Sequence, residues 1–163
     1  MKRVVVALLT VVSLCTGCFK KDEGCQYTQS STVAPANEQT VIEEYLAAND
    51  ITAIKHSSGM YYEIVQSGSG GYPGLCSSVQ INYVGKLTNG NTFDASTNAV
   101  FTLGTLIDGW KKGLPLIQKT GRIKLYIPPS LGYGGVDIKD RDNNVIIPAN
   151  SMLIFDITQL NFQ

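Results

Sequence analysis

Residues 78–91 read SVQINYVGKLTNGN, and the order of these side chains indicates the type of fold. Val79, Ile81 and Tyr83 stand two positions apart, with Gln80 and Asn82 between them. Side chains two positions apart lie on the same face of a strand, so the pattern predicts a strand that is buried on one face. The Asn-Gly pair that follows favours a tight turn between antiparallel strands.

Similar short runs of β-branched and aromatic residues lie on both sides of this stretch, separated by glycine and proline, as is typical of strands. The predicted strands cover residues 60–66, 78–87, 100–103, 122–127 and 152–162. Residues 107–117 can form one helix of about three turns, because Pro115 limits its length. We therefore expect an α+β domain over residues 51–163, in which a five-stranded, mostly antiparallel, curved sheet wraps over one short helix.

Residues 1–17 have the pattern of a secretory signal. Two basic residues precede an apolar run over residues 4–14, and small residues follow it. The run is shorter than the roughly 20 residues that a membrane-spanning helix needs. The end of the segment resembles a bacterial lipobox, although Cys15 stands where leucine is usual, three residues before Cys18. The resemblance implies cleavage before Cys18 and attachment of lipid to its thiol, and simple cleavage with secretion is the alternative.

The segment after the signal is predicted to be a tether followed by a helix. Residues 18–37 are mostly polar, which favours a flexible, lipidated tether. Its FKKDEG stretch resembles the charged signal of lipoproteins exported to the outer face of the cell, and an ordinary soluble tether explains it equally well. Asn37 can cap a short helix over residues 38–50. The face by which we expect this helix to dock on the domain consists of Val41, Ile42, Tyr45 and Leu46.

The cysteines predict one disulfide. If Cys15 is removed with the signal and Cys18 carries lipid, Cys25 and Cys76 remain. Bridges persist in the oxidising compartments to which secreted proteins go, so an even number of thiols predicts a Cys25–Cys76 bridge. The alternative is two free thiols.

The charge pattern excludes several kinds of partner. The chain has 13 basic and 13 acidic residues, and loss of the two basic residues in the signal leaves a net charge of about −2. Nothing forms a basic stripe for nucleic acid, and no basic amphipathic helix predicts membrane contact beyond the lipid. We therefore expect no nucleic-acid partner and a membrane contact through the lipid anchor only.

The sequence lacks the motifs of most enzyme classes. Its single histidine, His56, lies in a polar stretch and is expected to be a solvated loop residue. It contains no nucleophile triad pattern, zinc-ligand spacing, phosphate loop or dinucleotide fingerprint. We expect no metal and no cofactor, so any catalysis has to work without a strong base or nucleophile.

Aromatic and aliphatic blocks take the place of those motifs. They are INYVG at 81–85, NTFDAS at 91–96, FTLGTLIDGWKKGL at 101–114, TGRIKLYIP at 120–128, LGYGG at 131–135 and IIPANSMLIFDI at 146–157. In this order the blocks resemble the FKBP-type peptidyl-prolyl cis/trans isomerases, over residues 59–163. The resemblance implies catalysed rotation about X-Pro bonds in exported proteins, with proline-containing polypeptides as partners. We also expect a monomer.

The resemblance also assigns roles. Trp110, the only tryptophan, corresponds to the floor on which a proline ring rests, and Asp94 to a buried carboxylate. The backbone N–H of Ile107 and the hydroxyl of Tyr133 correspond to hydrogen-bond donors for the substrate. The implied catalytic set is Tyr83, Phe93, Asp94, Ile107, Trp110, Tyr133 and Phe155. The implied further substrate-binding residues are Leu106, Ile146 and Ile147.

Two departures from the family pattern leave other functions open. Ala99 replaces an aromatic residue, which predicts a thinner pocket wall, and residues 134–144 form a longer, charged loop that we expect to overhang the site. These departures and the N-terminal helix also fit a proline-peptide binding module or chaperone with incidental turnover. A purely structural surface lipoprotein is a third reading. The predicted location is the envelope of a Gram-negative bacterium, on an outer-membrane lipid anchor, either periplasmic or surface-exposed.

Overall fold

The computed structural model describes residues 24–163, apart from the side chain of Leu160. The predicted signal at 1–17 and the predicted lipidation site Cys18 lie outside these residues. Within the described part, no helix has the length and apolar character needed to cross a membrane.

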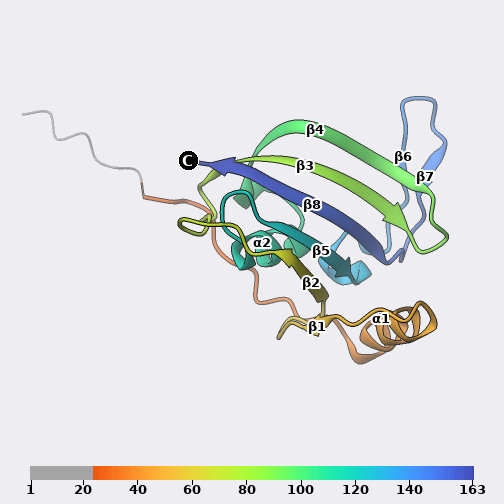
Figure 1. The fold of residues 1–163 in the computed structure, drawn as a ribbon. Coiled ribbons are helices and arrows are strands. Elements are labelled where there is room, and N and C mark those ends of the chain that lie inside the picture. Colours follow the sequence, from red (N-terminus) through yellow and green to blue (C-terminus); the bar gives the residue numbers. More distant parts are fainter. Residues whose placement is uncertain (1–23) are drawn as a thin grey trace, which may run out of the picture.

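One curved antiparallel sheet dominates the fold and confirms the predicted fold class (Figure 1). Its strands, in spatial order, are β1 (Ile54–Lys55), β2 (Tyr61–Gln66), β5 (Arg122–Ile127), β8 (Leu153–Phe162), β3 (Ser78–Leu87) and β4 (Thr92–Thr102). The five predicted strands are all present, and the two-residue β1 is added at one edge. A separate two-stranded hairpin consists of β6 (Ile138–Lys139) and β7 (Val145–Ile147).

Strand β4 is much longer than the predicted strand at 100–103, because it pairs with β3 along its whole length. The pairing runs from Ser78 opposite Thr102 to Lys86 opposite Thr92. A register shift accompanies Asn98, whose φ is 62°. Most of β4 is polar and exposed, as suits the edge strand of a sheet, so its sequence lacks the apolar alternation that marks β3.

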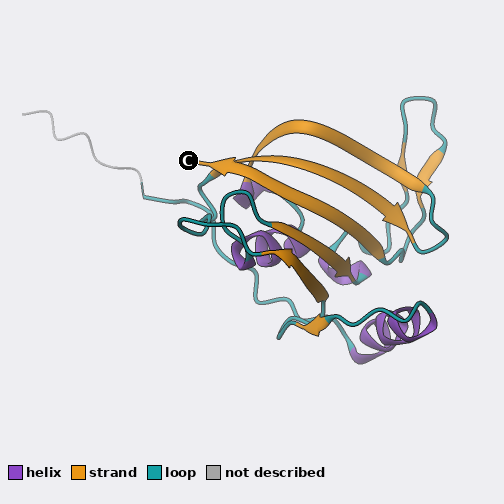
Figure 2. Cartoon of the chain, in the orientation of Figure 1, coloured by secondary structure: helices purple, strands orange, loops and turns teal. Residues whose placement is uncertain are grey.

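The predicted central helix is split into two short pieces beneath the sheet (Figure 2). Helix α2 covers Asp108–Gly113, and the 3₁₀ turn η2 (Leu114–Leu116) follows it. Another 3₁₀ turn, η1 (Leu103–Thr105), joins β4 to this region. Glycine lets α2 approach β5 closely, since a Cβ on Gly109 would lie 2.5 Å from the side chain of Ile127. This approach sets Trp110 among the core residues below the sheet.

Helix α1 (Ala36–Ala48) packs on the domain by its apolar face. Ile42 and Leu46 are buried against Tyr61 and Tyr126, and α1 lies beside β1 in Figure 1. Val41 does not share this face as predicted: it is 52% exposed, because it lies one residue before Ile42 on the helix and so turns toward solvent. The helix begins after Pro35 rather than after the predicted cap Asn37, and no side chain caps it. Pro35 itself occupies the N-cap position, with an extended backbone at φ −65° and ψ 156°.

The part of the predicted tether that the structure describes is docked rather than free. We call residues 24–35 the N-terminal strap. Cys25 is joined to Cys76 by a disulfide. Lys112 is buried and donates a hydrogen bond from Nζ to the Ser30 carbonyl, and the Ala34 N–H donates to the Ser58 carbonyl at 2.9 Å. The expected flexibility is therefore wrong for the strap, because backbone hydrogen bonds and a covalent bond hold it on the domain.

Candidate functional site

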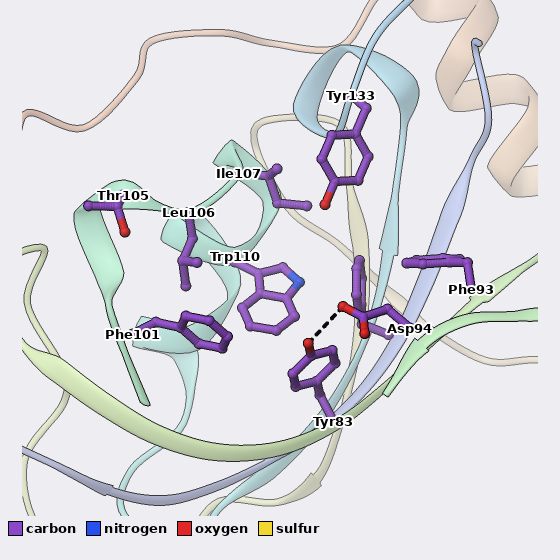
Figure 3. Close-up of a pocket in the computed structure, with 10 residues that line it drawn as sticks. Tyr83, Phe93, Asp94, Phe101, Thr105, Leu106, Ile107, Trp110 and Tyr133 are labelled. Carbon is purple, nitrogen blue, oxygen red and sulfur yellow. Dashed lines mark hydrogen bonds between the residues drawn. The ribbon is translucent and has the colours of Figure 1, made fainter. Parts of the chain in front are cut away.

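A cavity of about 320 Å³ opens between the sheet and the segment that carries η1 and α2 (Figure 3). Its lining consists of Tyr83, Phe93, Asp94, Phe101, Thr105, Leu106, Ile107, Trp110, Tyr133 and Phe155. A mostly aromatic lining with a few polar groups is typical of small-ligand sites, and the volume is at the lower end of their range. The cavity therefore suits a compact apolar group.

Trp110 forms the floor of the cavity, among the other lining side chains in Figure 3, and only 4% of its surface is exposed. Tyr83 and Phe155 meet the indole ring edge-to-face, with centroid distances of 5.1 and 5.0 Å. Phe101 meets it in the same way at 6.3 Å. Edge-to-face contacts are the preferred geometry of aromatic pairs, so these three rings fix the indole in one orientation. Within residues 24–163, the indole Nε1 has no hydrogen-bond partner.

Tyr83 and Asp94 form the hydrogen bond drawn in Figure 3. The Tyr83 hydroxyl donates to Oδ2 of Asp94 at 2.7 Å. Burial raises the pKa of Tyr83 well above its usual value, and the hydrogen bond to the carboxylate adds to this shift. Asp94 itself is exposed, which corrects the prediction of a buried carboxylate. It lies on the edge strand β4 at the mouth of the cavity, where solvent reaches it.

Besides the indole Nε1, two hydrogen-bond donors of the described cavity lining remain free for a ligand. The Tyr133 hydroxyl points into the cavity in Figure 3 and makes no hydrogen bond within the described chain. Burial raises the pKa of Tyr133, as does the charge of Asp94, so the hydroxyl stays protonated at neutral pH. Ile107 precedes the first turn of α2, and among residues 24–163 its backbone N–H also has no partner. The first N–H groups of a helix lack partners within the helix, which leaves this donor available.

The structure brings together eight of the ten predicted site residues and leaves out Ile146 and Ile147. Ile147 is buried in the core, whereas Ile146 lines a separate depression. The two are consecutive on β7, and consecutive residues of a strand point to opposite faces. Neither side chain lines the cavity.

Phe101 and Thr105 line the cavity but were not among the predicted site residues. Phe101 stands two residues after Ala99 on β4, and both pack against the core. The ring of Phe101 forms one aromatic wall of the cavity, and the thinner wall predicted from Ala99 stays a prediction. Because side chains two positions apart on a strand share a face, Phe101 could have been predicted to lie on the same face as Ala99. No sequence pattern indicated that Thr105 lines the cavity.

His56 lies away from the cavity and is half-buried rather than solvated. Its Nδ1 lies 2.8 Å from the Ser58 hydroxyl. Burial lowers the pKa of His56, and the nearby charge of Lys112 lowers it further. Across residues 24–163, no group of three or more His, Cys, Asp or Glu side chains is placed to hold a metal ion.

These features define the class of protein. The chain contains an α+β domain whose aromatic cavity has an indole floor, the donors of Ile107 and Tyr133, and one carboxylate at its mouth. Such a cavity can bind an apolar ring next to carbonyl groups, and it offers no strong nucleophile.

Comparison with known proteins identifies the family. Residues 73–160 match the model of the FKBP-type peptidyl-prolyl cis-trans isomerases, and the chain belongs to this family. A probable FKBP-type peptidyl-prolyl cis-trans isomerase of Haemophilus influenzae is 36% identical over 122 residues, covering 72% of this chain and 48% of the relative. The FKBP-type isomerase FkpA of Escherichia coli is 39% identical over 109 residues, covering 64% of this chain and 38% of FkpA.

Solved structures agree with this assignment. The crystal structure of Escherichia coli FkpA superposes with a TM-score of 0.66 at 34% identity, over 78% of this chain and 60% of that one. A peptidyl-prolyl cis-trans isomerase from Pseudomonas syringae gives a TM-score of 0.66 at 25% identity, over 81% of this chain and 98% of that one. The chain spans about half, or less, of the length of the curated relatives it matches.

Proposed function

We propose that this chain is a peptidyl-prolyl cis/trans isomerase that accelerates rotation about X-Pro bonds in exported polypeptides. Rotation meets a barrier of about 18–20 kcal/mol, because resonance gives the amide C–N bond partial double-bond character. The twisted transition state has lost this resonance, so it carries less charge separation and loses less by leaving water. An apolar cavity therefore binds the transition state more tightly than the planar amide, which is the condition for catalysis.

The observation that carries the proposal is the cavity over Trp110. In this proposal the proline ring rests on the indole, and the aromatic walls exclude water from the amide. The N–H of Ile107 and the hydroxyl of Tyr133 donate to substrate carbonyls. Asp94 holds the Tyr83 hydroxyl and adds its charge to the field in the cavity. A ten-thousand-fold acceleration requires only about 5.5 kcal/mol, which these modest interactions can supply together.

A peptide assay tests this function. Uncatalysed isomerisation takes tens of seconds, so acceleration by purified residues 19–163 is simple to measure. We expect the Trp110→Ala variant to lose most of the activity. Tyr72→Ala is the matched control, because Tyr72 is 60% exposed and does not line the cavity. A wild-type chain that leaves the peptide at its background rate rules out the enzymatic function.

A second candidate is a binding module or chaperone in which turnover is incidental. The docked helix α1 favours it, because a depression of about 310 Å³ lies between Tyr45 of this helix and Tyr126 of the sheet. Its lining combines tyrosine and aliphatic side chains with Lys86, Lys124 and Asp156, so it offers both apolar and charged contacts to an unfolded chain away from the catalytic cavity. Suppression of aggregation that survives Asp94→Ala and disappears on deletion of residues 37–50 supports this role.

We further propose a monomeric lipoprotein of the Gram-negative cell envelope, anchored to the outer membrane through Cys18 and either periplasmic or surface-exposed. The Cys25–Cys76 bridge supports an oxidising compartment, where such bonds persist. Metabolic labelling with a radioactive fatty acid tests the anchor. Label is expected on the wild-type protein and absent from Cys18→Ala, and an unlabelled wild-type protein refutes the anchor.

A further inference from the structure

A second depression, of about 470 Å³, adjoins the aromatic cavity on the other side of Phe93. It lies between the β3–β4 turn and strand β7, two segments far apart in the sequence. We call it the hairpin groove. Its apolar lining consists of Leu87, Phe93, Val145, Ile146 and Pro148.

The hairpin groove presents aliphatic side chains to solvent. Val145 is 46% exposed and Ile146 is 37% exposed, although they are adjacent on β7. Their neighbour Ile147 is buried in the core and anchors the strand. Single exposed aliphatic residues are common, whereas two beside a concave surface that adjoins another pocket mark a binding region.

The wall that carries these residues is held in place. Oδ1 of Asp140 accepts hydrogen bonds from the backbone N–H groups of Asp142 and Asn144, at 2.9 and 2.8 Å. Oδ1 of Asp137 accepts another from the N–H of Ala149 at 2.7 Å. These bonds close the β6–β7 loop on itself and tie its base to the chain that follows. The groove is therefore largely preformed, and a ligand does not have to order it.

Phe93 connects the hairpin groove to the aromatic cavity, because its ring lines both. The ring is fixed edge-to-face against Phe155, with a centroid distance of 5.5 Å. Side chains of an extended chain return to the same side at every second residue, so we take the side chain beyond Phe93 to belong to the second or third residue from the one in the cavity.

The chemistry of the lining selects the kind of side chain. None of the described residues that line the groove is charged; five are apolar, and Asn89, Asn91 and Thr92 are polar. Asn91 and Thr92 also line it, and within residues 24–163 their side chains make no hydrogen bond that would occupy them. Such groups can bond to the backbone of an extended peptide while the walls take an apolar side chain.

We propose that the hairpin groove is a second subsite for the polypeptide substrate, which binds an aliphatic or aromatic side chain two or three residues from the proline. This proposal rests on the proposed function, because it assumes that the proline occupies the cavity over Trp110. The subsite makes the enzyme selective for prolines flanked by apolar residues. The longer loop at 134–144 contributes by holding β7 in place.

Decapeptides with one central proline test the subsite. One series carries leucine, and a matched series glycine, at the second or third position on either side of the proline. With the full mature chain, we expect the leucine peptide to have about a tenfold higher kcat/KM at one of these positions, as burial of a few methylene groups allows. Val145→Ser combined with Ile146→Ser should abolish this preference. Val136→Ser is the control, because Val136 is 63% exposed on the same loop and does not line the groove.

A wild-type chain that treats leucine and glycine peptides alike overturns the subsite, as does a double variant that keeps the preference. If no peptide is isomerised faster than background, the proposed function fails. The Kd values of the leucine and glycine peptides are then compared instead, measured from the fluorescence of the sole tryptophan. A preference in Kd that the double variant loses supports the subsite without catalysis. Equal Kd values overturn it.

Discussion

Replacing Gly109 by alanine should destabilise the domain, because this position has no room for a methyl group. A Cβ there would lie 2.5, 2.6 and 2.8 Å from Cδ1, Cγ2 and Cγ1 of Ile127. Ile127 is buried on β5 and branched at Cβ, so few rotamers are open to it. Helix α2 or strand β5 must therefore shift.

The expected size of the effect follows from two opposing contributions. Overpacking a well-packed core costs about 1–3 kcal/mol, and alanine gains roughly 1 kcal/mol over glycine within a helix. Gly109 has a negative φ, so the backbone adds no strain of its own. The net loss for Gly109→Ala is then up to about 2 kcal/mol in the free energy of unfolding, and the neighbouring Trp110 moves with the helix.

Gly113→Ala is the matched comparison on the same helix. Its Cβ would meet Cδ1 and Cδ2 of Leu125 at 2.6 and 2.7 Å, the far end of a more flexible side chain. We expect a smaller loss of stability than at Gly109. Urea unfolding, followed by the fluorescence of Trp110, measures both. The packing argument is refuted if Gly109→Ala is as stable as the wild type, or if Gly113→Ala is the more damaging change.

Three further predictions follow from single contacts. Tyr83→Phe removes the hydrogen bond to Asp94 and should lower kcat/KM about fivefold, as loss of roughly 1 kcal/mol implies; an unchanged value in the peptide assay refutes this. Replacing Cys25 and Cys76 by serine opens a loop that joins residues 51 positions apart, and should lower the free energy of unfolding by about 4 kcal/mol. Urea unfolding measures this loss, and an unchanged midpoint excludes a stabilising bridge. The pKa of His56 is lowered in the folded protein, so at a pH between the folded and unfolded pKa values the unfolded state binds one more proton than the folded state. The contribution of neutral His56 to the free energy of unfolding is therefore fully present above the unfolded pKa near 6.5. It is lost as the pH falls through the folded pKa. The His56→Gln variant should lack this part of the pH dependence of unfolding, and an identical profile contradicts the assignment.

Short-range patterns made much of the fold predictable. Alternation along residues 78–87 marked β3, and the Asn-Gly pair marked the turn after it, because both signals depend on residues a few positions apart. Pro115 correctly limited the central helix. The polar strand β4 was underestimated, because only its pairing with β3 makes that sequence a strand.

The site was predictable to the extent that ordered blocks of aromatic residues identify a family. Eight predicted residues meet around one cavity, while Ile146 faces a different groove. The exposure of Asp94 and the contribution of Phe101 depend on how β4 lies at the edge of the sheet. No local sequence pattern indicates which face of an edge strand is exposed to solvent.

The sequence alone thus determined the alternating strands, the turn, the two cysteines available for pairing and the single indole. The tertiary structure decided that the strap lies against the domain, that the indole sits under a cavity and that Phe93 separates this cavity from a second one. The physical reason is range: propensity and alternation act over a few residues, whereas a cavity is bounded by side chains brought together from β3, β4, α2, β8 and the loop of Tyr133.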